Sequence, residues 1–572
     1  MLALKGIKIY NKVTDQYLLQ YSESGFNWLG SKRGGSFMKI NKLLIMLAVF
    51  LLFIGACSKK DTDTSTEPSD EELENLNDSG FPIVDEPITL NFFGGTGHLI
   101  KGDWEDMLIW KEYSNMTNIE VNWDMADQDL EEKRNLKLGS DDLPDAFYSA
   151  GIGNQELFKY GQNGVFIPLN DLIDDYAPNL KKVFEENPEV KKAMTFPDGN
   201  IYSFPTMQDF ASMRFSAKPF INEDFLNALD MEIPQTTDEF YEYLKAVKED
   251  DPNGNGKADE IPYGANSINQ LITWIRGSFG MGQGLQAGNV DLDPQTGDMR
   301  FYPITDEYKE MLEYVHKLYS EELIEQNIFS IENDQFHSNG ADGVYGATNW
   351  HSPNVTFGED AGKSYVGMPA LEGPHGDQTY SSVNHRAGTI ASFAITSENE
   401  YPAATVRWID HFFGEDGAKL LYLGVEGETF EETEDGEYEF VEEITNNPDG
   451  LTFDQALAQY LTYPGGNHVG RVQEKYFKGS EATQQELDAT EKLEEYVIDE
   501  VWPEFTYTKE ENEKLKTFGQ DIDKYVGEMR DKFITGDASF DEWDHYVEEI
   551  KKMNLEEYMN IKEKAYERYK SN

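Results

Sequence analysis

The sequence contains a single cysteine, Cys57, among its 572 residues. No disulfide can form within one chain, and the chain after residue 57 has no cysteine-based metal site or thiol nucleophile. Basic residues are also scarce, with 48 Lys and Arg against 107 Asp and Glu, which gives a formal net charge of −59. Nucleic-acid binding requires a basic surface, so this composition excludes it. The same charge predicts repulsion from anionic lipid headgroups.

Long apolar runs are absent as well, apart from the stretch that ends at Cys57. Residues 38–57 read MKINKLLIMLAVFLLFIGAC, in which two lysines precede an apolar run and small residues precede the cysteine. The run is too short to span a bilayer comfortably and is typical of a signal peptide. Because a cysteine follows directly, the segment resembles a bacterial lipoprotein signal with lipid on Cys57. The alternatives are an ordinary secretory signal with a chance cysteine and a short buried helix.

The segments on either side of this signal have different interpretations. Residues 1–37 lie where a signal peptide should already have begun, so we interpret Met38 as the true start and residues 1–37 as a misassigned extension. Residues 58–86 are polar and acidic with few large apolar side chains, which predicts a flexible tether. The expected location is the extracellular face of the plasma membrane, where the lipid is the only membrane attachment.

From residue 87 onward, strand-like and helical patterns alternate. The segments PITLNFFGG (87–95), NIEVNWDMA (118–126) and LPDAFYSAG (143–151) have the composition of strands. Helical spacing lies between them and continues at 222–229, 237–249, 306–319 and 401–413, and with two breaks over 509–569. This alternation predicts an α/β fold with a parallel sheet and a helix-rich C-terminal region.

Several segments, in order, resemble one family. They are LPDAF (143–147), FPDGNIYSFP (196–205), FINEDFLNAL (220–229), DPNGNGKADEIPYG (251–264), RWIDHFFGEDGAKLLYLGVEGETFE (407–431) and the helical tail at 507–569. Together they are similar to the extracellular solute-binding proteins of ABC sugar importers (solute-binding family 1). The similarity is to the large lipoprotein type of Gram-positive bacteria, which is related to alginate-binding proteins.

The resemblance implies an α/β, periplasmic-binding-protein-like (type II) fold of two lobes with an interlobe cleft. Lobe 1 is expected at residues 87–205 and about 381–440, and lobe 2 at 206–380 and about 441–572, including the C-terminal helices. The implied function is capture of an oligosaccharide, which is delivered to ABC transporter permease subunits by a monomeric protein without enzymatic activity. Ligand binding would then favour closure about a hinge.

The loop at 251–260, DPNGNGKADE, places oxygen-bearing side chains at alternate positions, as an EF-hand calcium loop does. The expected ligands are Asp251, Asn253, Asn255, Asp259, Glu260 and the backbone carbonyl of Lys257. Position twelve is Pro262 instead of the usual bidentate glutamate, so Glu260 is the natural substitute. We predict a structural Ca²⁺, because the three carboxylates repel one another until a cation neutralises them. The alternative is a plain Asn/Gly turn.

A sugar site needs aromatic platforms together with hydrogen-bonding side chains. Our candidates lie in loops after strand-like runs or at expected connections between the lobes. They are Trp274, Arg276, Trp350, His351, Arg386, Tyr202, Asp209 and Phe210. For each of them the competing interpretation is a structural role, either in the core or in an ion pair.

Two other classes of function fit an acidic, lipid-tethered protein. An extracellular glycoside hydrolase needs two carboxylates across the sugar, but so many acidic residues make such a pair uninformative. The sequence has no nucleophile elbow and no HExxH motif. A surface adhesin or a sugar-sensing accessory lipoprotein would share the signal and the tether. Neighbouring permease genes would favour transport, and a neighbouring histidine kinase alone would favour sensing.

Overall fold

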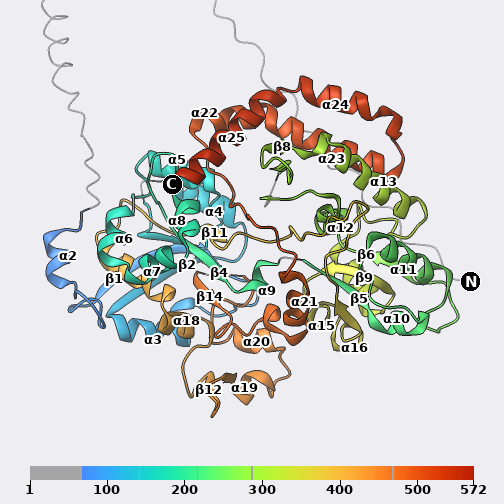
Figure 1. The fold of residues 1–572 in the computed structure, drawn as a ribbon. Helices are drawn as coiled ribbons and strands as arrows, with labels where there is room; N and C mark the ends of the chain where they lie inside the picture. Colours follow the sequence, from blue (N-terminus) through green and yellow to red (C-terminus); the bar gives the residue numbers. More distant parts are fainter. Residues whose placement is uncertain (1–66, 141, 216, 285–287, 467–468) are drawn as a thin grey trace, which may run out of the picture. The chain divides into compact units, whose positions relative to one another are not determined.

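The structure is a computed structural model that describes residues 67–140, 142–215, 217–284, 288–466 and 469–572 (Figure 1). The signal-like stretch, Cys57 and the first part of the expected tether lie outside these residues. Within the described residues, no helix is both long enough and apolar enough to cross a membrane.

The larger sheet has six strands in the order β14-β4-β11-β3-β1-β2. Their bounds are β1 (Ile88–Gly95), β2 (Ile119–Ala126), β3 (Ala146–Tyr148), β4 (Phe204–Asp209), β11 (Thr389–Ile395) and β14 (Gly470–Gln473). β1 pairs in parallel with β2 and β3, and β14 with β4, whereas β11 is antiparallel to both β3 and β4. Because only β11 is reversed, the other five strands end at the same edge of the sheet.

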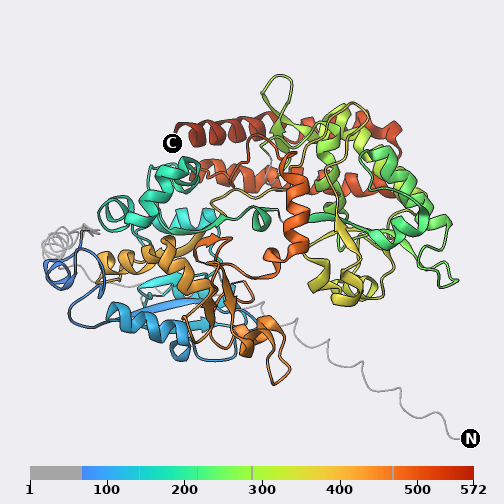
Figure 2. The same cartoon turned by 60° about the horizontal axis from the view of Figure 1, so that its bottom comes forward.

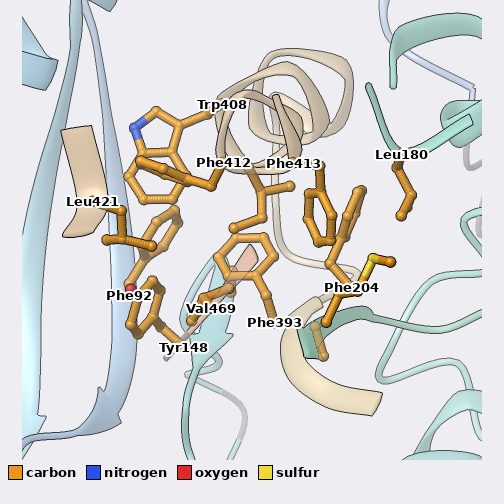
Figure 3. Packing of buried hydrophobic residues seen from close by; sticks show 14 of the residues in the cluster. Phe92, Tyr148, Leu180, Phe204, Phe393, Trp408, Phe412, Phe413, Leu421 and Val469 are labelled. Carbon is orange, nitrogen blue, oxygen red and sulfur yellow. The ribbon is translucent and has the colours of Figure 1, made fainter. Parts of the chain in front are cut away.

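Aromatic side chains fill the core beside this sheet (Figure 3). The ring of Phe92 on β1 lies 5.3 Å from Phe393 on β11 and 5.2 Å from Trp408, between ring centroids. Trp408 belongs to α17 (Pro402–Asp410) and is buried. The other helices around this core are α3 (Leu108–Thr117), α4 (Leu130–Leu138), α5 (Asn154–Gln162), α6 (Asn170–Tyr176), α7 (Pro178–Glu186), α8 (Pro188–Met194), α18 (Glu415–Tyr422), α19 (Glu442–Thr445) and α20 (Phe453–Leu457). We call this part the first lobe.

A second sheet, in the order β10-β5-β9-β6, organises the second lobe. Its strands are β5 (Lys218–Asn222), β6 (Ile261–Gly264), β9 (Tyr345–Trp350) and β10 (Tyr365–Gly367). Its helices are α10 (Glu223–Leu229), α11 (Thr237–Glu249), α12 (Ile268–Ile275), α13 (Asp306–Ser320), α14 (Asn333–Ala341), α15 (Pro353–Thr356), α16 (Glu359–Gly362) and α21 (Gln484–Glu494). The C-terminal helices, drawn in red in Figures 1 and 2, are α22 (Lys509–Lys514), α23 (Gln520–Thr535), α24 (Trp543–Lys552) and α25 (Leu555–Ser571).

Two antiparallel hairpins and one short helix lie outside the two main sheets. The hairpins are β7 (Val290–Leu292) with β8 (Met299–Phe301) and β12 (Phe430–Glu432) with β13 (Tyr438–Phe440). The short helix α9 (Ala211–Arg214) follows β4 directly.

The lobe boundaries differ from the expected ones in the last third of the chain. One hydrophobic cluster runs from Ile83 to Phe210 and from Ala387 to Phe477, so residues 441–477 belong to the first lobe and not to the second. The reason is that β14 pairs with β4. A second cluster runs from Phe215 to Val383 and from Leu493 to Ala565. Three crossing segments, residues 211–214, 384–386 and 478–483, connect the two lobes.

Residues 69–84 also differ from the expected tether, because they pack against the first lobe. In α2 (Asp70–Asn75), Glu72 is buried and its carboxylate accepts the backbone N–H of Ala404 in the first turn of α17, at 2.9 Å. Farther along α17, Arg407 donates to the carbonyl of Gly80 at 2.8 Å. Ile83 then joins the hydrophobic core. The acidic composition suggested a solvated segment, but one of its carboxylates caps a helix.

Candidate functional site

Polar side chains gather at the edge where the strands of the first lobe end. Asp209 is the last residue of β4, and Arg471 lies on β14 in register with Met207. Arg386 lies in a crossing segment, shortly before β11 begins at the same edge. In α/β sheets, ligands bind outside the carboxyl ends of the strands. This edge is therefore the first candidate surface for a ligand.

Asp209 is shared by two arginines at this edge. It pairs with Arg386 through one carboxylate oxygen, and the other oxygen accepts Nε of Arg471 at 2.9 Å. Arg386 also lies 3.5 Å from a carboxylate oxygen of Glu189, and Arg471 lies 3.6 Å from one of Glu186. Asp209 and Arg386 are both candidates predicted from the sequence, and they are in contact in the structure. Arg471 carried no motif that could have identified it.

A third arginine completes this charged group. Arg214 donates through Nε to the backbone carbonyl of Asn384 at 3.0 Å, which joins two of the crossing segments. Burial, together with the positive charge of Arg386, lowers the pKa of Arg214. The group thus holds three arginines and three carboxylates and is balanced in charge.

In the second lobe, Trp350 and His351 lie at the carboxyl end of β9. Trp350 is half-buried and packs edge-on against Phe336 at 5.3 Å between ring centroids. His351 is exposed, and its ring centroid lies 5.1 Å from that of Trp350. The neighbouring strand β6 is parallel to β9 and ends at the same edge. Trp350 and His351 therefore stand where the topology favours ligand contact.

Four other candidates are buried inside the lobes. Trp274 is 2 % exposed and packs against Phe240, 5.1 Å away between ring centroids, and Arg276 is buried and donates to the hydroxyl of Ser381 at 2.6 Å. Tyr202 and Phe210 are each 2 % exposed in the core of the first lobe. Because aromatic residues serve cores and sugar sites alike, the sequence could not separate the two roles.

The expected connection near residue 205 is also displaced. The segment FPTMQ lies within β4 and not between the lobes, and the crossing begins only after Phe210. The shift follows from the pairing of β4 with both β11 and β14. Among the described residues, a cavity of about 450 Å³ lies beside the N-terminal segment, with Asp78, Phe81 and His411 in its lining. None of our ligand candidates lines it.

The loop between α11 and β6 has its oxygen-bearing side chains turned toward one another. The side-chain amides of Asn253 and Asn255 donate to Asp259 at 3.2 and 3.0 Å. Asp251 accepts the backbone N–H groups of Asn255 and Gly256 at 3.1 and 2.7 Å. Gly254 and Gly256 have φ of +69° and +75°, values that glycine adopts without strain.

The side chain of Glu260 bears on whether this loop could hold a cation. Its Oε1 is buried without a hydrogen-bond partner among the described residues. An ionised carboxylate oxygen in that state is costly, and a hard cation would satisfy it. No group of three or more His, Cys, Asp or Glu side chains in the described chain has the arrangement of a metal site. The fit therefore depends on the asparagine and backbone oxygens together with the carboxylates.

Comparison with known proteins shows similarity over most of the chain. The family model described as "Bacterial extracellular solute-binding protein" matches residues 97–419. The fructooligosaccharide ABC transporter substrate-binding protein FusA of Streptococcus pneumoniae is 30% identical over 558 residues, which cover 94% of this chain and 99% of that protein.

Solved structures of the same relative are similar as well. FusA in complex with kestose has a TM-score of 0.68 at 29% identity, and the match covers 85% of this chain and 100% of that one. A FusA EF-hand mutant in complex with fructo-nystose matches with the same TM-score, identity and coverage.

Proposed function

The chain belongs to the bacterial extracellular solute-binding proteins, and from that membership we propose that it binds an oligosaccharide and delivers it to the permease of an ABC transporter. The similarity to FusA over almost the entire length of both chains carries this proposal. The two-lobe α/β fold supports it, because such lobes close around a ligand about a hinge.

We propose that the sugar contacts both sets of strand ends. Trp350 offers an aromatic face beside His351 in the second lobe, and Asp209 and Arg386 offer hydrogen-bonding groups in the first lobe. Sugars present flat C–H faces and rims of hydroxyls, which suit such a combination. The ligand would stabilise the closed form through its higher affinity for closed than for open lobes.

The charges favour a neutral oligosaccharide. The three arginines nearest the strand ends, Arg214, Arg386 and Arg471, are balanced by Asp209, Glu186 and Glu189. An anionic sugar would have to displace one of these carboxylates and would also meet a chain with a net charge of −59. Neutral fructans such as kestose are therefore the first ligands to test.

The test is a thermal-shift screen of residues 58–572 with kestose, nystose and oligogalacturonate, followed by chromatography of the sugars. We expect the neutral oligosaccharides to raise Tm and to be recovered unchanged. New reducing ends would favour a glycoside hydrolase instead. If no oligosaccharide in the screen raises Tm, the proposal is wrong.

We also propose that the loop at 251–260 binds Ca²⁺ through Asp251, Asn253, Asn255, Asp259, Glu260 and the carbonyl of Lys257. Support comes from the convergence of the loop side chains and from the unpartnered Oε1 of Glu260. A relative with a named EF-hand adds to it. The ion would have a structural role, because it would neutralise the carboxylates of one connection between α11 and β6.

Lipid on Cys57 would hold this monomeric binding protein at the outer face of the membrane. The sequence of residues 38–57 supports the anchor, and the family is extracellular. Two acyl chains give stable anchoring where one would not. A binding protein without an enzymatic step of its own depends on remaining close to its permease.

A further inference from the structure

The described chain contains an ion pair that is almost completely buried beside a crossing segment. Nζ of Lys218 lies 2.5 Å from Oε2 of Glu486, and the two side chains are 2 % and 1 % exposed. Lys218 is the first residue of β5, and Glu486 lies in the first turn of α21. Figure 1 shows α21 next to α9 and β5.

Lys218 also contacts the chain that enters the second lobe from α9. Besides Glu486, its ammonium group donates to the carbonyls of Ser212 at 2.9 Å and Phe215 at 3.2 Å. All three of its donors are therefore used. Ser212 is itself in a crossing segment, and its hydroxyl donates to the carbonyl of Glu481 in another, at 2.7 Å.

The second carboxylate oxygen of Glu486 contacts the turn that follows Trp350 and His351, the residues that we propose contact the sugar. Oε1 accepts the backbone N–H of Ser352, the residue that follows Trp350 and His351. Ser352 has φ of +30°, a left-handed conformation that is unfavourable for a residue other than glycine. Next to it, the N–H of Asn354 donates to the side chain of Gln485 at 3.0 Å. The first turn of α21 thus holds the turn after β9 in a strained form.

Stability alone does not account for this arrangement. Replacing a buried ion pair by apolar side chains of similar size is often neutral or stabilising, because the charges must be removed from water. An apolar pair could not accept the N–H of Ser352, and it could not donate to the carbonyls of Ser212 and Phe215. The distinctive property of Glu486 is that its single carboxylate contacts both the turn after β9, at Ser352, and Lys218, which holds the crossing segment.

We propose that Glu486 is a positioning residue that couples the Trp350–His351 turn to the crossing segments, so that ligand contact at this turn is transmitted to lobe closure. This proposal rests on the proposed function, in which Trp350 and His351 contact the sugar. It assigns Glu486 no contact with the ligand.

The first test is hydrogen exchange of the free protein, which needs no ligand. In Glu486→Gln the amide oxygen can accept from Lys218 or from Ser352 but not from both, because the NH2 group then faces the other donor. If the two segments are coupled, loss of either contact makes exchange at least tenfold faster both at residues 350–356 and at residues 211–215. The matched control is Asp291→Asn. Asp291 is also a buried carboxylate in the second lobe that pairs with an arginine, Arg300, and accepts a backbone N–H, from Gly282. The control should leave both segments at the wild-type rate.

A second variant covers the case in which Glu486→Gln does not fold. The double substitution Lys218→Met with Glu486→Met keeps the volume and removes both charges, so we expect it to fold. It should still lose protection at residues 350–356, because the acceptor for Ser352 is gone. Wild-type exchange there in the double variant, or a change confined to one segment in Glu486→Gln, would overturn the coupling.

The ligand arm separates this proposal from the proposed function. Calorimetry with kestose should give at least tenfold weaker binding for Glu486→Gln than for Asp291→Asn, and X-ray scattering should show less compaction on ligand addition. Equal affinity and compaction in the two variants would contradict transmission to closure. If kestose fails to bind the wild type while exchange changes as expected, the ligand assignment is wrong and the mechanical coupling stands.

Discussion

At the scale of single residues, Glu72 shows how one side chain can change the interpretation of a whole segment. Its burial raises the pKa of this carboxyl from 4.5 to about 7, although hydrogen bonds from the start of α17 act in the opposite direction. A carboxyl with a raised pKa in the folded state contributes stability at low pH. That contribution is lost as the pH rises through the folded-state pKa.

We therefore expect Glu72→Gln to be more stable than wild type at pH 8 and little different at pH 4.5. The amide stays neutral and its oxygen can still accept the N–H of Ala404. A shift from 4.5 to about 7 corresponds to about 3 kcal/mol at most. Urea unfolding of both proteins at the two pH values measures the gap, with the exposed Glu71→Gln as the control. A gap that does not grow with pH would contradict the burial argument.

At the scale of elements, the proposed Ca²⁺ site in the loop between α11 and β6 allows a direct test. Addition of Ca²⁺ to metal-free protein should raise Tm, and a concentration 100 times Kd corresponds to about 2.7 kcal/mol. Asp259→Asn should abolish most of this increase, because it removes a charged ligand. The control is Asp298→Asn in the separate turn at 293–298. An unchanged Tm on chelation with EDTA would argue for a plain Asn/Gly turn.

Elements with a clear hydrophobic period could be predicted from the sequence. β1, β2, α11 and α13 lie where the patterns placed them, because each buries one continuous face or a whole strand. Pairings between distant segments could not be predicted in this way. Nothing in the sequence GRVQ of β14 identifies β4 as its partner, so residues 441–477 are expected in the second lobe, whereas they pack with the first.

The candidate site was predictable only in part, for a related reason. Asp209 and Arg386 are a polar pair at a strand end, and the sequence identified both. Trp274 and Tyr202 had the same composition signals, yet packing against Phe240 and Gly161 places them inside. Whether an aromatic side chain faces core or solvent depends on the layer above it, which local periodicity does not reveal.

At the scale of the whole molecule, the proposed lipid on Cys57 would decide where the protein works. We expect Cys57→Ala to release an intact protein into the medium, because the variant lacks the proposed lipid attachment and the net charge of −59 repels anionic headgroups. Cell fractionation with immunoblotting checks the distribution. The released protein should show the same thermal shift with sugars as wild type. Retention of the variant at the cell surface would contradict the anchor.

The packing of residues 69–84 onto α17 would shorten the flexible tether between the membrane and the two lobes of the binding protein. The twelve residues from Ser58 to Ser69 span at most about 40 Å, compared with about 100 Å for the 29 residues of a tether that ended at Glu86. With lipid on Cys57, a shorter tether would confine the binding protein to a much smaller volume above the membrane. Each permease nearby would meet its loaded receptor at a correspondingly higher effective concentration. Because Glu72 helps to hold residues 69–84 on α17, it would affect how often the ligand-bound protein meets the permease.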